Sequence, residues 1–100
     1  MKTPSYKQET MNIRVRLTRL LAECTKSPSM VYVNGHTIGD CLNNLVEKYP
    51  DSRQCFFDRN GGLIINISVN RQKFISHKDQ LSLPVKEGDE IELLNVVAGG

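Results

Sequence analysis

The 100-residue chain has no tryptophan, few aromatic residues and no marked excess of charge of either sign. A formal net charge of +2, with no run of Lys and Arg, argues against binding to nucleic acid or to an anionic membrane. No apolar stretch approaches the roughly 20 residues that a membrane-spanning helix needs. The segment from Met1 to Tyr6 also lacks the apolar core of a signal peptide. These absences predict one small cytoplasmic domain that is a monomer when alone.

Cysteine is also scarce, and its spacing is informative. Cys24, Cys41 and Cys55 are odd in number and widely separated, which matches neither a disulfide framework nor a C-x-x-C zinc site. We therefore expect three reduced thiols. His36 lies in a predicted turn and His77 in a polar loop, neither with a ligand partner at metal spacing. The sequence predicts no metal site and no bound cofactor.

Three segments of the first half have clear local patterns. Residues 1–10 are polar and aperiodic, and we expect a flexible leader. Residues 12–18 alternate apolar and polar side chains, which predicts a half-buried strand. Residues 30–33 form a second strand that ends at the Asn34-Gly35 turn signal, so the two strands form a hairpin with a loop longer than two residues. The segment between them, residues 20–24, is ambiguous.

One amphipathic helix is the clearest predicted element. Thr37 is its expected N-cap, with Asp40 three residues later near the positive end of the helix dipole. Pro50 ends the helix, because the residue before a proline is forced out of the helical region. The apolar stripe recurs at helical spacing over three turns and consists of Ile38, Cys41, Leu42, Leu45, Val46 and Tyr49.

The pattern of the second half predicts three further strands. Residues 63–69 alternate like a half-buried strand, residues 72–75 form a short edge strand, and residues 90–94 form the last strand. A short turn over residues 51–57 packs Phe56 or Phe57 under the sheet. The predicted order is β-β-α-β-β-β, and one amphipathic helix covers one face of a mixed sheet of four to five strands. This is a two-layer α+β domain over residues 11–95.

The other face of this sheet is a candidate docking surface. Parallel pairing of the first and last strands would bring Arg14 and Arg16 beside Glu90 and Glu92. Such a charge pattern is also what a plain solvated surface shows, where each pair contributes little. Two apolar side chains, Ile64 and Leu94, would lie among these charges. Exposed apolar residues rimmed by charge are typical of a protein-binding face.

The C-terminal tail is the most informative segment. After Val96, Val97 and Ala98 the printed chain ends in Gly99 and Gly100, a pairing that chance produces in roughly 0.5% of chains. Glycine lacks a side chain, so its backbone enters slots that a Cβ would block. We expect residues 96–100 to be a flexible stalk that threads an enzyme channel. A frayed terminus without function is the plain alternative.

These features resemble the MoaD/ThiS family of ubiquitin-like sulfur carriers. The resemblance rests on the strand order, on the segment Lys86-Glu87-Gly88-Asp89-Glu90-Ile91 and on the terminal Val97-Ala98-Gly99-Gly100, and it covers residues 11–100. Within the family, the segment Ile65-Asn66-Ile67-Ser68-Val69-Asn70 and the tail look most like the CysO-type carriers of cysteine biosynthesis. Molybdopterin synthase small subunits usually carry a Pro-Pro pair where this chain has Asn95-Val96. Their aromatic segment after the first strand is replaced by Thr18-Arg19-Leu20-Leu21.

The resemblance implies a β-grasp fold and a reaction cycle. In this cycle an E1-like enzyme adenylates Gly100 with ATP, and sulfur converts it to a thiocarboxylate. The chain would be a protein co-substrate and not an enzyme. It would donate sulfur to a synthase, either a pyridoxal-phosphate enzyme or the large subunit of molybdopterin synthase. The alternatives are a small subunit of molybdopterin synthase, a ubiquitin-like modifier that forms isopeptides, and an interaction domain whose tail is incidental.

Overall fold

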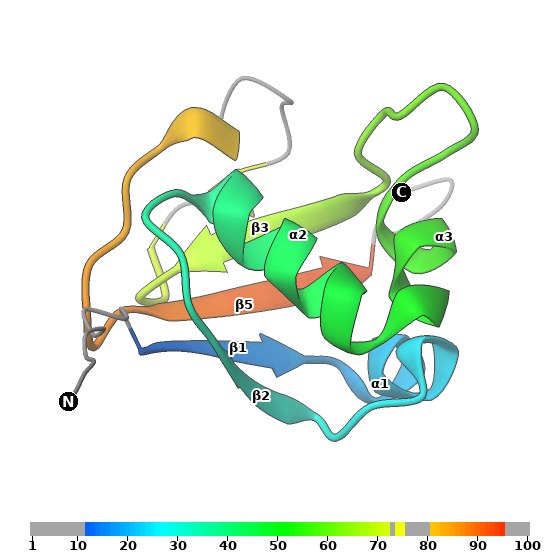
Figure 1. The fold of residues 1–100 in the computed structure, drawn as a ribbon, viewed down its shortest axis with the longest axis horizontal. Helices are drawn as coiled ribbons and strands as arrows, with labels where there is room; N and C mark the ends of the chain where they lie inside the picture. Colours follow the sequence, from blue (N-terminus) through cyan, green and yellow to red (C-terminus); the bar gives the residue numbers. More distant parts are fainter. Residues whose placement is uncertain (1–11, 73, 76–80, 96–100) are drawn as a thin grey trace, which may run out of the picture.

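The computed structural model of the chain describes residues 12–72, 74–75 and 81–95. Five strands and three helices, with a 3-10 turn, make up the described fold (Figure 1). In chain order they are β1 (Ile13–Leu17), α1 (Arg19–Thr25), β2 (Met30–Val33), α2 (Ile38–Lys48), η2 (Pro50–Ser52), α3 (Arg53–Phe56), β3 (Ile65–Val69), β4 (Phe74–Ile75) and β5 (Glu90–Asn95). The predicted leader, residues 1–10, and the predicted tail, residues 96–100, lie outside the described residues.

The first two strands pair antiparallel, as the sequence predicts, with Val15 opposite Val31. Their connection differs from a plain loop because the ambiguous segment forms α1. Thr18 caps this helix: its hydroxyl accepts a hydrogen bond from the backbone N–H of Leu21 at 3.2 Å. Lys26 ends it in the left-handed conformation, with a φ of 58°. The irregular part of the connection therefore begins at Lys26.

The main helix, α2, is confirmed together with its cap. The Thr37 hydroxyl accepts from the backbone N–H of Asp40 at 3.0 Å, which satisfies one of the free donors of the first turn. The Asp40 carboxylate in turn accepts from the backbone N–H of His36 at 3.2 Å. The helix ends at Lys48, two residues before Pro50, as the steric effect of proline predicts.

The sheet has the order β2-β1-β5-β3-β4. The first and last strands lie side by side at its centre and run parallel, with Arg14 opposite Glu90 and Arg16 opposite Glu92. Both predicted pairings are confirmed. β4 lies at one edge of the sheet, as predicted, and pairs with β3, while β2 forms the other edge. The strand expected from residue 63 begins at Ile65, and Leu63 forms an isolated bridge to Phe57 instead.

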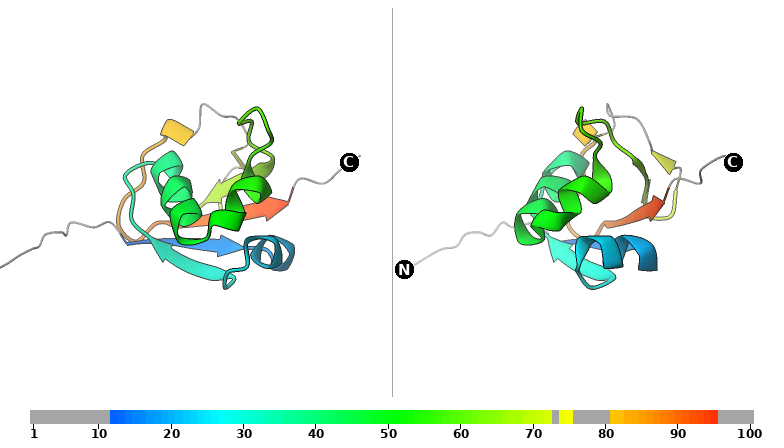
Figure 2. Two further views of the ribbon diagram at one scale, coloured as in Figure 1. Left: turned by 45° about the vertical axis from the view of Figure 1, so that its right-hand side comes forward. Right: turned by 90° about the vertical axis from the view of Figure 1, so that its right-hand side faces the viewer.

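The helices α2 and α3 lie against one face of this sheet (Figures 1 and 2). The core lies between these helices and the sheet. It contains alternate residues of the strands and the apolar stripe of α2, and Phe56 is its largest fully buried side chain. The expected turn after the main helix is therefore present as η2 and α3. A mixed sheet with one main helix across one face is the β-grasp architecture that the resemblance implies. No helix of the described residues is long and apolar enough to cross a membrane.

The cysteines correct the sequence analysis. Cys24 and Cys55 form a disulfide that joins α1 to α3, so the prediction of three reduced thiols is wrong. The two residues are 31 positions apart, and only the tertiary packing of the two short helices brings their Cα atoms to 6.2 Å. Cys41 is free and fully buried on α2, as its place on the apolar face predicts. Burial raises the pKa of the Cys41 thiol to about 12, which makes it a poor nucleophile.

One buried hydroxyl has an unfavourable environment. Ser52, the last residue of η2, is fully buried, and its Oγ has no hydrogen-bond partner among the described residues. We expect Ser52→Ala to raise the free energy of unfolding by about 1 kcal/mol, because it removes a buried polar atom that no group satisfies. Urea unfolding of the oxidised chain measures this change.

Thr25→Val is the matched control for this prediction. The Thr25 hydroxyl is equally buried but donates to the carbonyl of Ala22 at 3.1 Å. Its removal should lower the free energy of unfolding by about 1 kcal/mol. A Ser52→Ala variant as destabilised as Thr25→Val would show that the Ser52 hydroxyl is satisfied in solution.

Candidate functional site

The face of the sheet opposite α2, hereafter the open face, presents the alternate residues of the two central strands. Arg14 and Arg16 project from β1, and Glu90, Glu92 and Leu94 project from β5. Their neighbours in the sequence point the other way and are almost fully buried, for example Val15 and Ile91. The period of two in the strand sequence therefore places this charged group on the uncovered side.

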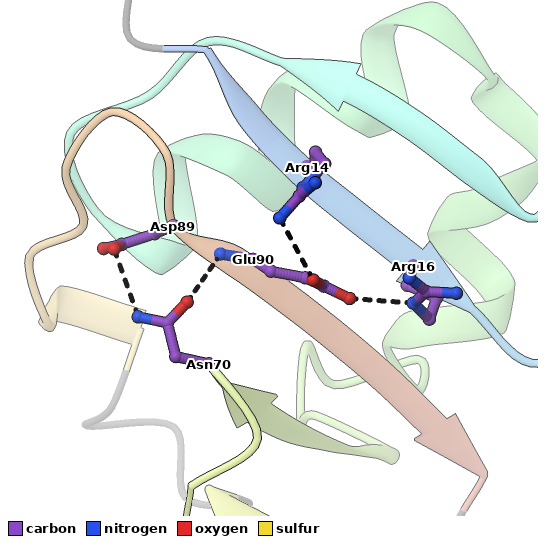
Figure 3. Close-up of polar contacts among 5 residues, drawn as sticks. All are labelled: Arg14, Arg16, Asn70, Asp89 and Glu90. Atoms are coloured by element: carbon purple, nitrogen blue, oxygen red, sulfur yellow. Dashed lines mark hydrogen bonds and ion pairs between the residues drawn. The ribbon is translucent and has the colours of Figure 1, made fainter.

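The Glu90 carboxylate is the centre of the charged group (Figure 3). Arg16 Nε donates to Glu90 Oε2 at 2.8 Å, and Arg14 Nη2 donates to Glu90 Oε1 at 3.3 Å. Arg16 therefore bonds the carboxylate diagonal to it, although Glu92 is the residue directly opposite. The hydrogen bond from Arg16 holds the pKa of Glu90 below its ordinary value and raises the pKa of Arg16.

The turn before β5 fixes the position of Glu90. Gly88 adopts a φ of +92°, a conformation that glycine takes without strain. This lets the Asp89 carboxylate accept from the backbone N–H of Lys86 at 2.9 Å and from the Asn70 amide at 3.1 Å. Asn70 also accepts from the backbone N–H of Glu90 at 2.9 Å (Figure 3). Burial opposes ionisation of Asp89, but these hydrogen bonds prevail and lower its pKa.

The lowered pKa of Glu90 predicts how the free energy of unfolding depends on pH. A carboxyl whose pKa is lower in the folded chain stabilises the fold above its unfolded-state pKa, here about 4.5, and loses that contribution as pH falls through the folded-state pKa. We expect Glu90→Gln to lower the free energy of unfolding at pH 7, and the difference from the original chain to disappear in acid. Chemical unfolding between pH 7 and pH 2 measures it.

Glu92→Gln is the control for this pH dependence. Glu92 lies two residues along β5, and no Lys or Arg of the described residues forms an ion pair with it. Glu92→Gln keeps the hydrogen bonds between the two arginines and Glu90, so at pH 7 it should be less destabilised than Glu90→Gln. A Glu90→Gln difference that stays constant from neutral to acid pH would contradict the ion-pair account.

The apolar part of the open face lies toward the end of β5. Leu94 is half-buried and stands opposite Asn66, while Ile64, just before β3, is 41% exposed. Leu94 therefore lies on the open face and is more buried than Ile64, and a contact of these two residues with a partner stays a prediction. Ser68 stands opposite Glu92 on the same face but is buried, and its hydroxyl donates to the carbonyl of Gln72 at 3.1 Å.

One neighbouring residue was missed from the sequence. Leu20, at the start of α1, has 66% of its surface exposed. Thr18, which caps α1, donates to the side-chain oxygen of Asn95 at 2.6 Å, so the start of α1 lies against the end of β5. The sequence gives no clear signal for this exposure, because α1 has only seven residues, and Leu21 and Ala22 are buried while the neighbouring Leu20 is not.

The remaining predicted site residues follow Asn95 directly. Val96, Val97, Ala98, Gly99 and Gly100 lie outside the described residues, as does His77. The end of β5, with Leu94, Ile64 and Leu20, is thus the described surface from which these residues continue. Among residues 12–72, 74–75 and 81–95, no three His, Cys, Asp or Glu side chains are grouped so that they could hold a metal ion. The absence of a bound cofactor stays a prediction.

Comparison with known proteins gives concordant matches. The sequence model of the ThiS family matches residues 15–100. Ubiquitin-related modifier 1 of Encephalitozoon cuniculi is 36% identical over 66 residues, which cover 64% of this chain and 68% of that protein. The crystal structure of SAMP1 from Haloferax volcanii is similar with 30% identity and a TM-score of 0.73, over 89% of this chain and 99% of that chain.

A third similarity concerns the fold alone. A chain of the BexX/CysO complex of Amycolatopsis orientalis is 23% identical with a TM-score of 0.70, over 88% of this chain and 99% of that chain. The relatives are small ubiquitin-like carrier and modifier proteins, not catalytic enzymes, in agreement with the expectation from the sequence. The family match also extends to residue 100 and so includes both terminal glycines.

Proposed function

The chain belongs to the ThiS family of ubiquitin-like carriers and small modifiers, and we propose that it is a sulfur carrier protein with its chemistry at Gly100. An E1-like enzyme adenylates the Gly100 carboxylate with ATP. A sulfur nucleophile then displaces AMP and leaves a C-terminal thiocarboxylate, which donates its sulfur in biosynthesis. The observation that supports this most strongly is the family match, which runs through Gly99 and Gly100.

The chemistry needs little from the carrier itself. A carboxylate is a poor electrophile, and adenylation gives it a leaving group that sulfur can replace. Tethering the product to the carrier delivers sulfur at a high effective concentration to the acceptor enzyme. Gly99 and Gly100 supply backbone thin enough to enter the adenylation site. In this proposal the carrier binds no cofactor or metal, and ATP is bound by its partner.

The open face is the proposed docking surface for the adenylating enzyme. Arg14 and Arg16 supply charge and Ile64 and Leu94 supply apolar area, next to the point from which Val96, Val97 and Ala98 continue. An apolar centre with a charged rim is the usual composition of a protein interface. The ion pairs with Glu90 hold the two arginines in place before the partner arrives.

A second candidate is a ubiquitin-like protein modifier. Two relatives with at least 30% identity are named as modifiers, which favours this alternative. In a modifier the same adenylate passes to a lysine of a target protein and forms an isopeptide bond. Both functions share the activation of Gly100 and differ only in the acceptor.

The recipient pathway is a finer proposal. We favour a cysteine-type pathway with a pyridoxal-phosphate acceptor enzyme, because residues 65–70 look like CysO-type carriers. A molybdopterin synthase large subunit is the alternative acceptor, with this chain as the small subunit. The absence of the Pro-Pro pair at Asn95-Val96 weighs against it. We propose a monomer in the cytoplasm, where ATP is available to the adenylating partner.

Intact-mass spectrometry of the protein recovered from its native cells distinguishes these functions. A carrier population is heavier by the difference between a sulfur and an oxygen atom. A modifier population includes conjugates of much higher mass that contain a lysine isopeptide to Gly100. Recovery of neither form, under conditions of active sulfur metabolism, would contradict both proposals.

A further inference from the structure

The disulfide between Cys24 and Cys55 is the one strong feature that the proposed function does not use. Cys24 lies in the last turn of α1 and Cys55 lies in α3. In the sequence, β2, α2 and η2 lie between these two helices. The Cα atoms are 6.2 Å apart, within the range usual for a disulfide. The bond therefore fits the packing of the two helices.

The two cysteine residues differ in their exposure to solvent. Cys24 is an exposed residue, whereas Cys55 is only 6% exposed. In thiol–disulfide exchange a thiolate attacks one sulfur along the S–S axis, and the other sulfur leaves as a thiolate. An external thiolate can therefore reach Cys24, and Cys55 is the leaving group. The carbonyl oxygen of Asp51 lies 3.4 Å from Cys55 Sγ, where it can accept a hydrogen bond from the reduced thiol.

Besides the disulfide, α1 is held by three buried residues, Leu21, Ala22 and Thr25, and by one ion pair to η2. Lys26 Nζ pairs with Asp51 Oδ2 at 3.1 Å, but both side chains are largely exposed, and such pairs contribute little. The same region contains the unsatisfied hydroxyl of Ser52, one turn before Cys55. The covalent bond thus adds to this packing and restricts how far α1 can move from α3.

The position of α1 matters for the C-terminal end of the sheet. The hydroxyl of Thr18, at the start of α1, donates to Asn95, the last residue of β5. Movement of α1 therefore changes the surroundings of the point from which residues 96–100 continue. It also moves Leu20, the most exposed large apolar residue of the described chain.

We propose that Cys24–Cys55 is a reversible redox site that controls how well the chain is activated. A dithiol reductant attacks Cys24 Sγ, which forms a mixed disulfide and releases Cys55 as a thiolate that takes up a proton. The second thiol of the reductant then attacks the mixed disulfide, which leaves Cys24 reduced and the reductant oxidised, a transfer of two electrons. The oxidised chain holds α1 against α3, and in the reduced chain α1 keeps its buried residues but moves more freely relative to α3. The effect on activation rests on the proposed function, but the redox site does not.

The site itself is tested on the full chain without any partner enzyme. After unfolding, alkylation should label one thiol in the oxidised chain and three after treatment with dithiothreitol. Brief exposure of the folded chain to glutathione should place the mixed disulfide on Cys24, as read by peptide mapping. Amide hydrogen exchange over residues 19–25 should become at least about tenfold faster on reduction, because the local opening is no longer constrained.

The functional effect is tested by pyrophosphate exchange with the cognate adenylating enzyme. Reduction should slow exchange at least about threefold, since small displacements near a reacting group reduce rates strongly. The double variant Cys24→Ser/Cys55→Ser should match the reduced chain and ignore dithiothreitol, whereas Cys41→Ala should respond like the original chain.

Three alkylated thiols in air-oxidised chain, or mixed disulfide on Cys55, would overturn the redox site. Equal exchange rates for the oxidised and reduced chains would overturn its control of activation. An absence of exchange in both forms would instead contradict the proposed function, while the labelling and hydrogen-exchange results would still decide the redox site.

Discussion

Removal of Gly100 is expected to abolish ATP-dependent activation of the chain by its adenylating enzyme and to leave the thermal unfolding temperature unchanged. The truncated chain ends at Gly99, whose carboxylate falls about 3.5 Å short of the nucleotide, the length of one extended residue. Nucleophilic attack on ATP requires the reacting atoms to be in near contact, so this shortfall is decisive. The described core contains no residue beyond Leu93, which is why stability should not change.

Gly99→Val tests the same account by a steric change at constant length. A Cβ at this position should block entry of the chain into the adenylation site, and pyrophosphate exchange should again be lost. Deletion of residues 1–10 is the control, because it shortens the other terminus and should retain exchange. Exchange at the original rate by a chain that ends at Gly99 would contradict the carrier and the modifier proposals together and leave an interaction domain.

Leu94→Asp is expected to reduce the efficiency of activation about tenfold to a hundredfold, a loss of about 1.4–2.7 kcal/mol of transition-state binding. The new carboxylate would place a charge in the apolar part of the open face, where the partner must exclude water. Leu94 is half-buried and has Asn66 as its cross-strand neighbour, so the fold should tolerate the change. Steady-state kinetics of pyrophosphate exchange and a thermal unfolding scan measure the two effects.

Leu83→Asp is the matched control for the docking surface. Leu83 is 41% exposed, and its backbone carbonyl accepts a hydrogen bond from the backbone N–H of Ile38, the first residue of α2. This substitution makes the same chemical change away from the open face and should leave activation unaffected. If it slows activation as much as Leu94→Asp, the open face is not the docking surface. If Leu94→Asp unfolds the domain, Leu94 belongs to the core.

The central part of the fold was predictable because local patterns determine it. Alternation over residues 12–18 and 90–94 identifies the buried face of each strand, and parallel pairing of these strands sets Arg14 beside Glu90. The helix cap at Thr37 and the stop before Pro50 depend on neighbouring residues only. Such features need no knowledge of the rest of the chain.

The features that were missed depend on tertiary packing. α1 is seven residues long, too short for a helical period to be read, and Thr18 and Lys26 define its ends only once the chain turns there. The Cys24–Cys55 bond requires α1 and α3 to meet, which their separation of 31 residues does not reveal. Arg16 bonds Glu90 along a diagonal, a choice made by side-chain length and not by register.

The candidate site also contains residues that could be predicted from the sequence and residues that could not. The charged residues of the open face and Ile64 and Leu94 could be assigned from strand alternation. Leu20 could not, because its exposure follows from how the short helix α1 sits beside the end of β5. The role proposed for Gly99 and Gly100 rests on chemistry and on the family resemblance, since glycine has no side chain from which a contact could be inferred.

Top-down mass spectrometry of the full chain, after incubation with the cognate E1-like enzyme, ATP and a sulfur donor, tests the central claim most directly. The account predicts that the chain gains the mass difference between one sulfur and one oxygen atom, and that fragment ions place this gain on Gly100. Gain of a whole sulfur atom on Cys24, Cys41 or Cys55, as a persulfide, would contradict it. So would a chain that remains unchanged while the enzyme consumes ATP.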